Sequence, residues 1–167
     1  GVIQVPAVNK FGKGWVYNGD MLDLGSAAVW AIAMAPSVAA KATPETREAI
    51  LADERAAGGP FSWGDQRIWQ LLKGQSLRDL PIARHLPFWQ EWLTHRDDPT
   101  YFSNSNAAAR FDQVSRPHLH WSGWFDLFQR NSVDAFEGIV AHGANARARD
   151  GQRLLIGPWA HGICSDC

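Results

Sequence analysis

Two residues late in the chain bring together a carboxylate and an imidazole. Asp126 ends the run Gly-Trp-Phe-Asp, and His161 follows the run Gly-Pro-Trp-Ala. A buried carboxylate that accepts a hydrogen bond from one imidazole nitrogen fixes the tautomer of the ring. The other nitrogen is then free to take a proton from a nucleophile. These residue types therefore have the chemistry of the acid and the base of a catalytic triad.

Each of these residues directly follows a predicted strand. Residues 117–121 and 153–157 have strand-like patterns, and the apolar residues between Leu127 and His142 lie at helical spacing. This order predicts a right-handed crossover between parallel strands of an α/β sheet. Because ligands bind at the carboxyl ends of such strands, we expect Asp126 and His161 to lie within hydrogen-bond distance of each other. A sheet of two strands leaves both edges unpaired, so we expect further strands from sequence outside these residues.

The residues before about 112 have helical patterns and predict no strand. Residues 1–20 predict an irregular loop. Helices are expected from Met21 to about Ala42 with a break at Pro36, from Pro44 to Ala57 behind a Thr43 cap, from Trp63 to Lys73, and from Pro87 to just before Arg96. Five tryptophans of this part are expected to pack in a core: Trp15, Trp63, Trp69, Trp89 and Trp92.

Composition excludes several classes of partner. The chain has 167 residues, 46% of them apolar, which is typical of a globular protein. A net charge of -1 gives no basic surplus, so we expect no nucleic acid and no anionic membrane as a partner. The longest apolar run, Ala27 to Ala35, is much shorter than the roughly 20 residues that span a bilayer. Composition does not indicate an oligomeric state.

The acid and histidine segments resemble those of one hydrolase group. Residues 116–126 and 151–162 are similar to the corresponding segments of the cocaine-esterase and X-Pro dipeptidyl-peptidase (CocE/NonD) group of α/β-hydrolases, which includes α-amino acid ester hydrolases and cephalosporin acylases. Upstream, Trp15 to Ala35 and Leu80 to Phe102 look like the first and last helices of its cap. The resemblance implies a fragment of an α/β-hydrolase fold, with a helical cap region over residues 1–112 and the last strand-helix-strand of the parallel sheet over residues 113–167.

The same resemblance implies a serine hydrolase that cleaves ester or amide bonds, either acyl or X-Pro peptidyl. Asp126 would orient His161, which would act as general base and then as general acid. The substrate would be a small-molecule ester, an amide or a short peptide, and the resemblance implies neither a metal nor an organic cofactor. The helical cap would form much of the acyl pocket.

The sequence lacks the turn that carries the nucleophile in this group. A nucleophile elbow needs Gly-x-Ser-x-Gly, and no such run is present. The nearest run, Gly74 to Arg78, lacks the second glycine and is interpreted as a helix end with a loop. We therefore expect the serine upstream of Gly1, and we expect the chain by itself to be inactive because the oxyanion donors are lost with the serine.

Other interpretations of these residues remain open. Asp126 could cap a helix, and His161 could be a structural loop residue. Trp124 and Trp159, beside the two candidate catalytic residues, are candidates for substrate contact. The chain as a whole could be a non-catalytic hydrolase-like or helical binding module. A Gly-x-Ser-x-Gly run in the coding sequence before Gly1 would favour the enzyme.

A metal site is a weaker alternative. His118 and His120 alternate on a predicted strand and so face the same side, where they could bind zinc together with His161 or with the Cys164 and Cys167 pair. A catalytic zinc needs three well-aimed ligands with supporting hydrogen bonds, which this pattern does not supply. The two cysteines are too close in sequence to link distant parts of a fold.

Overall fold

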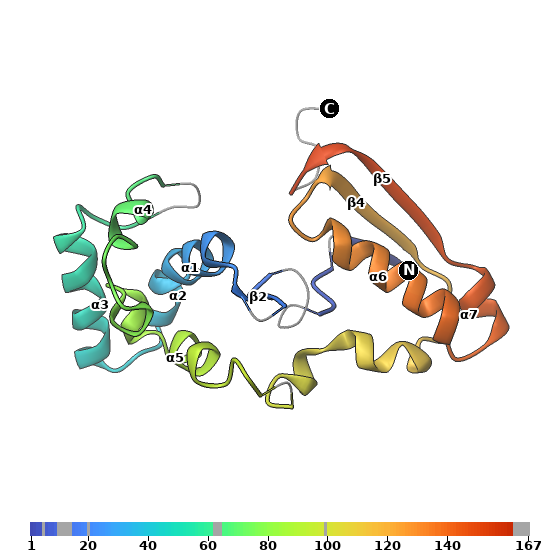
Figure 1. Cartoon of the computed structure of the whole chain (residues 1–167), viewed down its shortest axis with the longest axis horizontal. Coiled ribbons are helices and arrows are strands. Elements are labelled where there is room, and N and C mark those ends of the chain that lie inside the picture. Colours follow the sequence, from blue (N-terminus) through green and yellow to red (C-terminus); the bar gives the residue numbers. More distant parts are fainter. Residues whose placement is uncertain (5, 10–14, 20, 62–64, 99, 162–167) are drawn as a thin grey trace. The chain divides into compact units, whose positions relative to one another are not determined.

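A computed structural model (Figure 1) describes residues 1–161 except residues 5, 10–14, 20, 62–64 and 99. The chain forms two compact units. The strand unit comprises Gly1–Met21 and Asp98–Cys167, and the helical unit comprises Leu22–Asp97. The division into a cap over residues 1–112 and a core over residues 113–167 stays a prediction, because packing units alone do not identify a cap.

The strand unit contains a sheet of three parallel strands. The strands are β1 (Val2–Gln4), β4 (Leu119–Phe125) and β5 (Arg153–Ala160), in the order β1-β4-β5. The chain passes from β4 to β5 through α6 (Gln129–His142) and the short α7 (Ala146–Asp150), and α6 packs against both strands (Figure 1). The prediction of a strand, a helix and a parallel strand is confirmed.

The prediction that residues 1–20 form only an irregular loop is wrong. β1 pairs with β4, and the backbone N–H of Leu119 donates to the oxygen of Gly1 at 3.0 Å. Tyr17–Asn18 (β2) and Met21–Leu22 (β3) form a second sheet of two short strands. Strands of two or three residues are too short to show an alternating pattern, and long-range pairing decides their conformation.

The two faces of the main sheet differ. His120 and Ser122 are buried on the face that α6 covers, and the His120 ring lies 5.8 Å from the ring of Phe136 on α6. Trp121 and Leu155 point to the opposite face, since side chains alternate along a strand. A small core of Val8, Phe111, Ala135 and Ile139 packs α6 against the N-terminal segment and the 3₁₀ helix η4 (Ala107–Gln113). The 3₁₀ helix η4 precedes β4 and follows η3 (Ser103–Ser105).

A helix lies within each of the four predicted stretches, but the third covers only Ile68–Leu71 of the predicted Trp63–Lys73, and the first begins at Leu24 because Met21–Leu22 is a strand. The helices of the helical unit are α1 (Leu24–Ala33), α2 (Ala35–Ala39), α3 (Pro44–Ala56), α4 (Ile68–Leu71) and α5 (Pro87–Thr94), with 3₁₀ turns η1 (Leu77–Asp79) and η2 (Ala83–His85). The break before α2 lies at Met34 because Pro36 fits the first turn of a new helix. Thr43 caps α3 as predicted. Residues 63 and 64 of the third predicted helix lie outside the described residues.

Several aromatic side chains of the helical unit pack against one another. The rings of Trp30, Phe88 and Trp92 have centroids 5.1 to 5.8 Å apart. Trp89 is completely buried, and its indole N–H donates to the oxygen of Leu77 at 2.8 Å.

The predicted packing of the tryptophans is confirmed in most cases. Trp15, Trp89 and Trp92 are buried, whereas Trp69 leaves 44% of its surface exposed and packs only in part. The remaining residue of the set, Trp63, lies outside the described residues.

A strained turn in the helical unit depends on Asp53. Ile82 has φ 68 and ψ -59, the geometry of a γ-turn that side chains rarely adopt, and the N–H of Ala83 donates to the oxygen of Pro81 at 2.8 Å. The N–H of Ile82 donates to Asp53 Oδ2 at 2.8 Å, and Arg84 donates to both oxygens of the same carboxylate. Burial opposes ionisation of this carboxyl, but the N–H of Ile82 and the Arg84 guanidinium outweigh it and lower the pKa of Asp53.

Replacing Asp53 by alanine should destabilise the helical unit by about 2 kcal/mol, because the buried N–H of Ile82 loses its acceptor. The measurement is the free energy of unfolding in urea. Glu48→Ala is the matched control on the same helix: Glu48 pairs with Arg55, but both side chains are more than 60% exposed. That control should change stability by less than about 1 kcal/mol. Equal losses for the two variants would contradict the proposed anchoring of the turn.

His120 makes the stability of the strand unit depend on pH. Burial lowers the pKa of His120, and its Nε2–H donates to Gln152 Oε1 at 2.8 Å. Nδ1 is buried and has no hydrogen-bond partner among the described residues. Protonation would add an N–H that has no acceptor, which also disfavours the charged form.

Stability should therefore fall as the pH drops below about 6.5, the ordinary pKa of histidine. Below that pH His120 binds a proton in the unfolded chain but not in the folded one. The free energy of unfolding then falls by up to about 1.4 kcal/mol per pH unit. Urea unfolding at several pH values should show a shallower acid loss for His120→Leu than for the wild type. Parallel curves for the two proteins would assign the acid loss to other groups, among them His118, whose pKa is also lowered by burial.

Candidate active site

Asp126 lies directly after β4, and its side chain is fully buried. Its two carboxylate oxygens have different tasks. Oδ1 accepts a hydrogen bond from the backbone N–H of Phe128 at 2.6 Å, at the beginning of α6, and Oδ2 accepts one from His161 Nδ1 at 3.1 Å. The contact with the imidazole is therefore present, whereas the predicted cap is not, because the N-cap of α6 is Phe128 and no side chain caps this helix.

His161 lies directly after β5, and 42% of its side chain is exposed. A carboxylate oxygen can only accept, so Nδ1 carries the proton in this contact. Within the described part of the chain, no hydrogen bond engages Nε2 of His161. The ring therefore has one nitrogen held by a buried carboxylate and the other available to a further group.

An irregularity in the pairing of β4 with β5 sets the level of these two residues. Gly123 pairs with Gly157, whereas Phe125 pairs with Ala160, so β5 contains one more residue than β4 over this stretch. With this bulge the residues that follow the last pair are Asp126 and His161. Without it, Asp126 would lie level with Ala160. Bulges commonly redirect a side chain at the end of a strand in this way.

The two tryptophans that are candidates for substrate contact have different surroundings. Trp124 is 62% exposed beside Asp126. Trp159 is half-buried: its indole lies against the backbone of Gly123 and Gly157, and its ring centroid is 5.9 Å from that of Trp121. Their contact with substrate stays a prediction, and Trp124 has the more accessible side chain of the two.

The zinc alternative finds no support in the described residues. No group of three metal-binding side chains occurs there. The rings of His118 and His120 are 6.4 Å apart, and His120 is engaged by Gln152. Cys164 and Cys167 lie outside the described residues.

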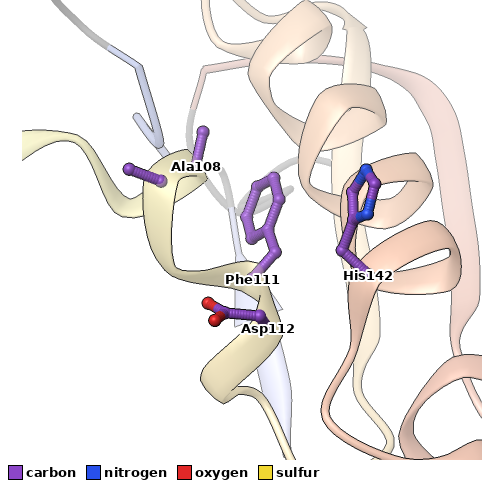
Figure 2. A pocket seen from close by; sticks show the side chains of 5 residues that line it. Ala108, Phe111, Asp112 and His142 are labelled. Atoms are coloured by element: carbon purple, nitrogen blue, oxygen red, sulfur yellow. The ribbon is translucent and has the colours of Figure 1, made fainter.

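A second carboxylate and imidazole lie near each other without meeting. Asp112 and His142 line a hollow of about 190 Å³ between η4 and α6. Figure 2 shows the Phe111 ring between them and the Asp112 carboxylate pointing away from His142. Both residues are exposed. The hollow therefore lacks the arrangement that Asp126 and His161 have.

From the sequence, Phe128 is one of the apolar residues at helical spacing between Leu127 and His142, with no further role predicted. In the structure the rings of Phe128 and His161 meet edge to face with centroids 5.2 Å apart, and Trp15 meets Phe128 in the same manner at 5.8 Å. Its position two residues after Asp126, at the predicted beginning of a helix, could have indicated that Phe128 lies beside the site. Trp15 gave no such signal, because it is distant in sequence.

Comparison with known proteins identifies the family. No helix among the described residues is long and apolar enough to cross a membrane. No curated protein matches the chain. The family model described as X-Pro dipeptidyl-peptidase (S15 family) matches residues 2–163, nearly the full length, and confirms the resemblance of the acid and histidine segments. The chain belongs to the X-Pro dipeptidyl-peptidase (S15) family, whose members are hydrolases of the peptidase and esterase type.

Proposed function

We propose that Asp126 and His161 are the acid and the base of a Ser-Asp-His triad in an α/β-hydrolase. The observation that carries the proposal is the hydrogen bond of 3.1 Å from His161 Nδ1 to a fully buried carboxylate. Three further features support it: the parallel strands, the position of both residues at the carboxyl ends of neighbouring strands, and the family. The serine is supplied by chain outside these 167 residues, which contain no Gly-x-Ser-x-Gly run.

In the proposed reaction, His161 moves protons at Nε2. The serine oxygen attacks the carbonyl carbon of the substrate while its proton passes to Nε2. That proton then goes to the departing alcohol or amine, which leaves an acyl-enzyme. Water attacks the acyl carbon, gives a proton to Nε2, and the serine recovers it as the acid product leaves. Asp126 stabilises the imidazolium that forms twice in this cycle.

The helical unit contains an apolar hollow of its own. A hollow of about 680 Å³ in this unit is lined by Trp30, Met34, Val38 and Phe88, with Lys41 among its polar residues. Apolar hollows with a few polar groups are typical of sites for small molecules. The proposed acyl transfer fits substrates with an acyl or peptidyl group on an ester or amide bond, including X-Pro peptides. No metal or organic cofactor takes part in the proposed mechanism.

A phosphonate probe that reacts with activated serines tests this function in the complete protein. We expect one covalent adduct per chain, located by mass spectrometry on the serine of a Gly-x-Ser-x-Gly run. Hydrolysis of an aryl ester, an acyl amide and an X-Pro anilide then ranks the substrate classes by kcat/KM. A protein that remains unlabelled and cleaves none of the three would instead be a non-catalytic module.

A further inference from the structure

Phe128 contacts both members of the proposed acid and base pair. Its backbone N–H donates to Asp126 Oδ1 at 2.6 Å, and its ring meets the ring of His161 with an interplanar angle of 78°. The same residue thus fixes the carboxylate through its main chain and contacts the imidazole through its side chain.

The imidazole needs such a contact because few other contacts fix the orientation of its ring. His161 follows the last residue of β5, and among the described residues its side chain makes one hydrogen bond, from Nδ1. Rotation of the ring about its Cβ–Cγ bond would break this hydrogen bond and would also move Nε2. An edge-to-face contact with a neighbouring ring opposes this rotation.

Phe128 is itself held in place. The backbone oxygen of Phe128 accepts hydrogen bonds from the N–H of Ser132 at 3.0 Å and from its hydroxyl at 3.3 Å. Trp15, which is only 8% exposed, lies edge to face against the Phe128 ring. The contact on His161 is therefore made by a side chain backed by a buried tryptophan.

We propose that Phe128 is a positioning residue for His161. It holds the imidazole in the orientation that keeps Nδ1 on Asp126 and directs Nε2 toward the group to be deprotonated. The inference rests on the proposed function for its catalytic consequence, but the geometry of the pair is independent of it. Phe128 acts through His161.

The chain contains a matched comparison on the same helix. Phe136 of α6 meets His120 edge to face at 5.8 Å, but His120 is fully buried and takes no part in the proposed reaction. Phe128→Leu and Phe136→Leu each remove one aromatic ring, the first at the N-cap of α6 and the second within the helix. Phe128→Tyr keeps a six-membered ring against His161 and serves as the conservative variant.

Histidine NMR on the complete protein tests the positioning directly. The Nδ1 proton of His161 should exchange with water at least about tenfold faster in Phe128→Leu than in the wild type, because a turning ring breaks its hydrogen bond more often. In the same variant kcat should fall by up to about 100-fold with KM nearly unchanged, the usual cost of a displaced catalytic group. Phe128→Tyr should keep the exchange rate and kcat close to those of the wild type, and Phe136→Leu should change neither.

Several outcomes would overturn the proposal. They are an unchanged exchange rate and kcat in Phe128→Leu, equal effects of Phe136→Leu, or a rise in KM at constant kcat, which would make Phe128 a substrate contact. Should Phe128→Leu unfold, Phe128→Met, which also removes the ring, provides the same readouts, with Phe128→Tyr as its comparison. A changed exchange rate together with full activity of His161→Ala would retain the positioning and overturn the proposed function instead.

Discussion

His161→Ala should lower kcat of the complete protein by about 10⁴-fold without a loss of folding. The side chain is 42% exposed and makes one hydrogen bond to the part of the chain that the structure describes, so its removal should cost little stability. The reaction, however, loses the group that takes the serine proton and delivers it to the leaving group. The measurement is steady-state kinetics on the substrate with the largest kcat/KM, alongside a thermal melt.

Asp126→Asn should have a comparable effect for a different reason. The amide nearly preserves the size of the buried side chain, and its oxygen can still accept from Phe128. Its NH₂ group would then face His161 Nδ1 and favour the tautomer that carries the proton on Nε2, where it blocks general-base action. Asp112→Asn and His142→Ala are controls, since they alter the other carboxylate and imidazole pair. Turnover like that of the wild type in either site variant would refute the assigned roles.

The main geometry of this site was predictable because it depends on topology. Strand, helix and strand in sequence order force the strands to be parallel, and parallel strands deliver the residues after their ends to one edge. Topology alone therefore predicts that Asp126 and His161 lie at the same edge of the sheet. The bulge that levels the two residues was not predictable, because the choice of pairing depends on how Gly123 and Gly157 meet Trp159 in space.

Local chemistry also explains which elements could be predicted. Thr43 and Pro44 begin α3, and Pro87 begins α5, because capping groups and a fixed φ act within one turn of the chain. β1 has no such local signal: it is extended because β4 supplies hydrogen bonds from more than a hundred residues away. The contacts of Trp15 with Phe128 are of the same long-range kind.

The contact between Asp126 and His161 requires β4 and β5 to approach closely just before both strands end. At that level each strand has a glycine, Gly123 and Gly157, which pair with each other. The indole of Trp159 occupies the space above these glycines that side chains would otherwise fill. The absence of a side chain at both glycines therefore allows the close approach of β4 and β5 that brings Asp126 to His161.

Gly123→Ala should accordingly destabilise the strand unit by about 3 kcal/mol or more. A Cβ at Gly123 would lie closer to the backbone oxygen of Trp159 than real Cβ atoms approach any atom. A backbone oxygen within a paired strand cannot swing aside, so β4 and β5 would have to separate where the site is formed. Urea unfolding measures the loss, and kcat of the complete protein should fall with it because Asp126 is displaced.

Two further variants separate this clash from a general intolerance of larger residues. At Gly157 the nearest atoms to a new Cβ belong to the Trp159 ring, so Trp159→Ala should relieve Gly157→Ala but leave Gly123→Ala as harmful as before. Gly25→Ala in α1 meets no atom nearer than 3.5 Å and should be neutral or stabilise by up to about 1 kcal/mol. Relief of Gly123→Ala by Trp159→Ala would show that the indole, and not the backbone of β5, limits how closely the strands approach.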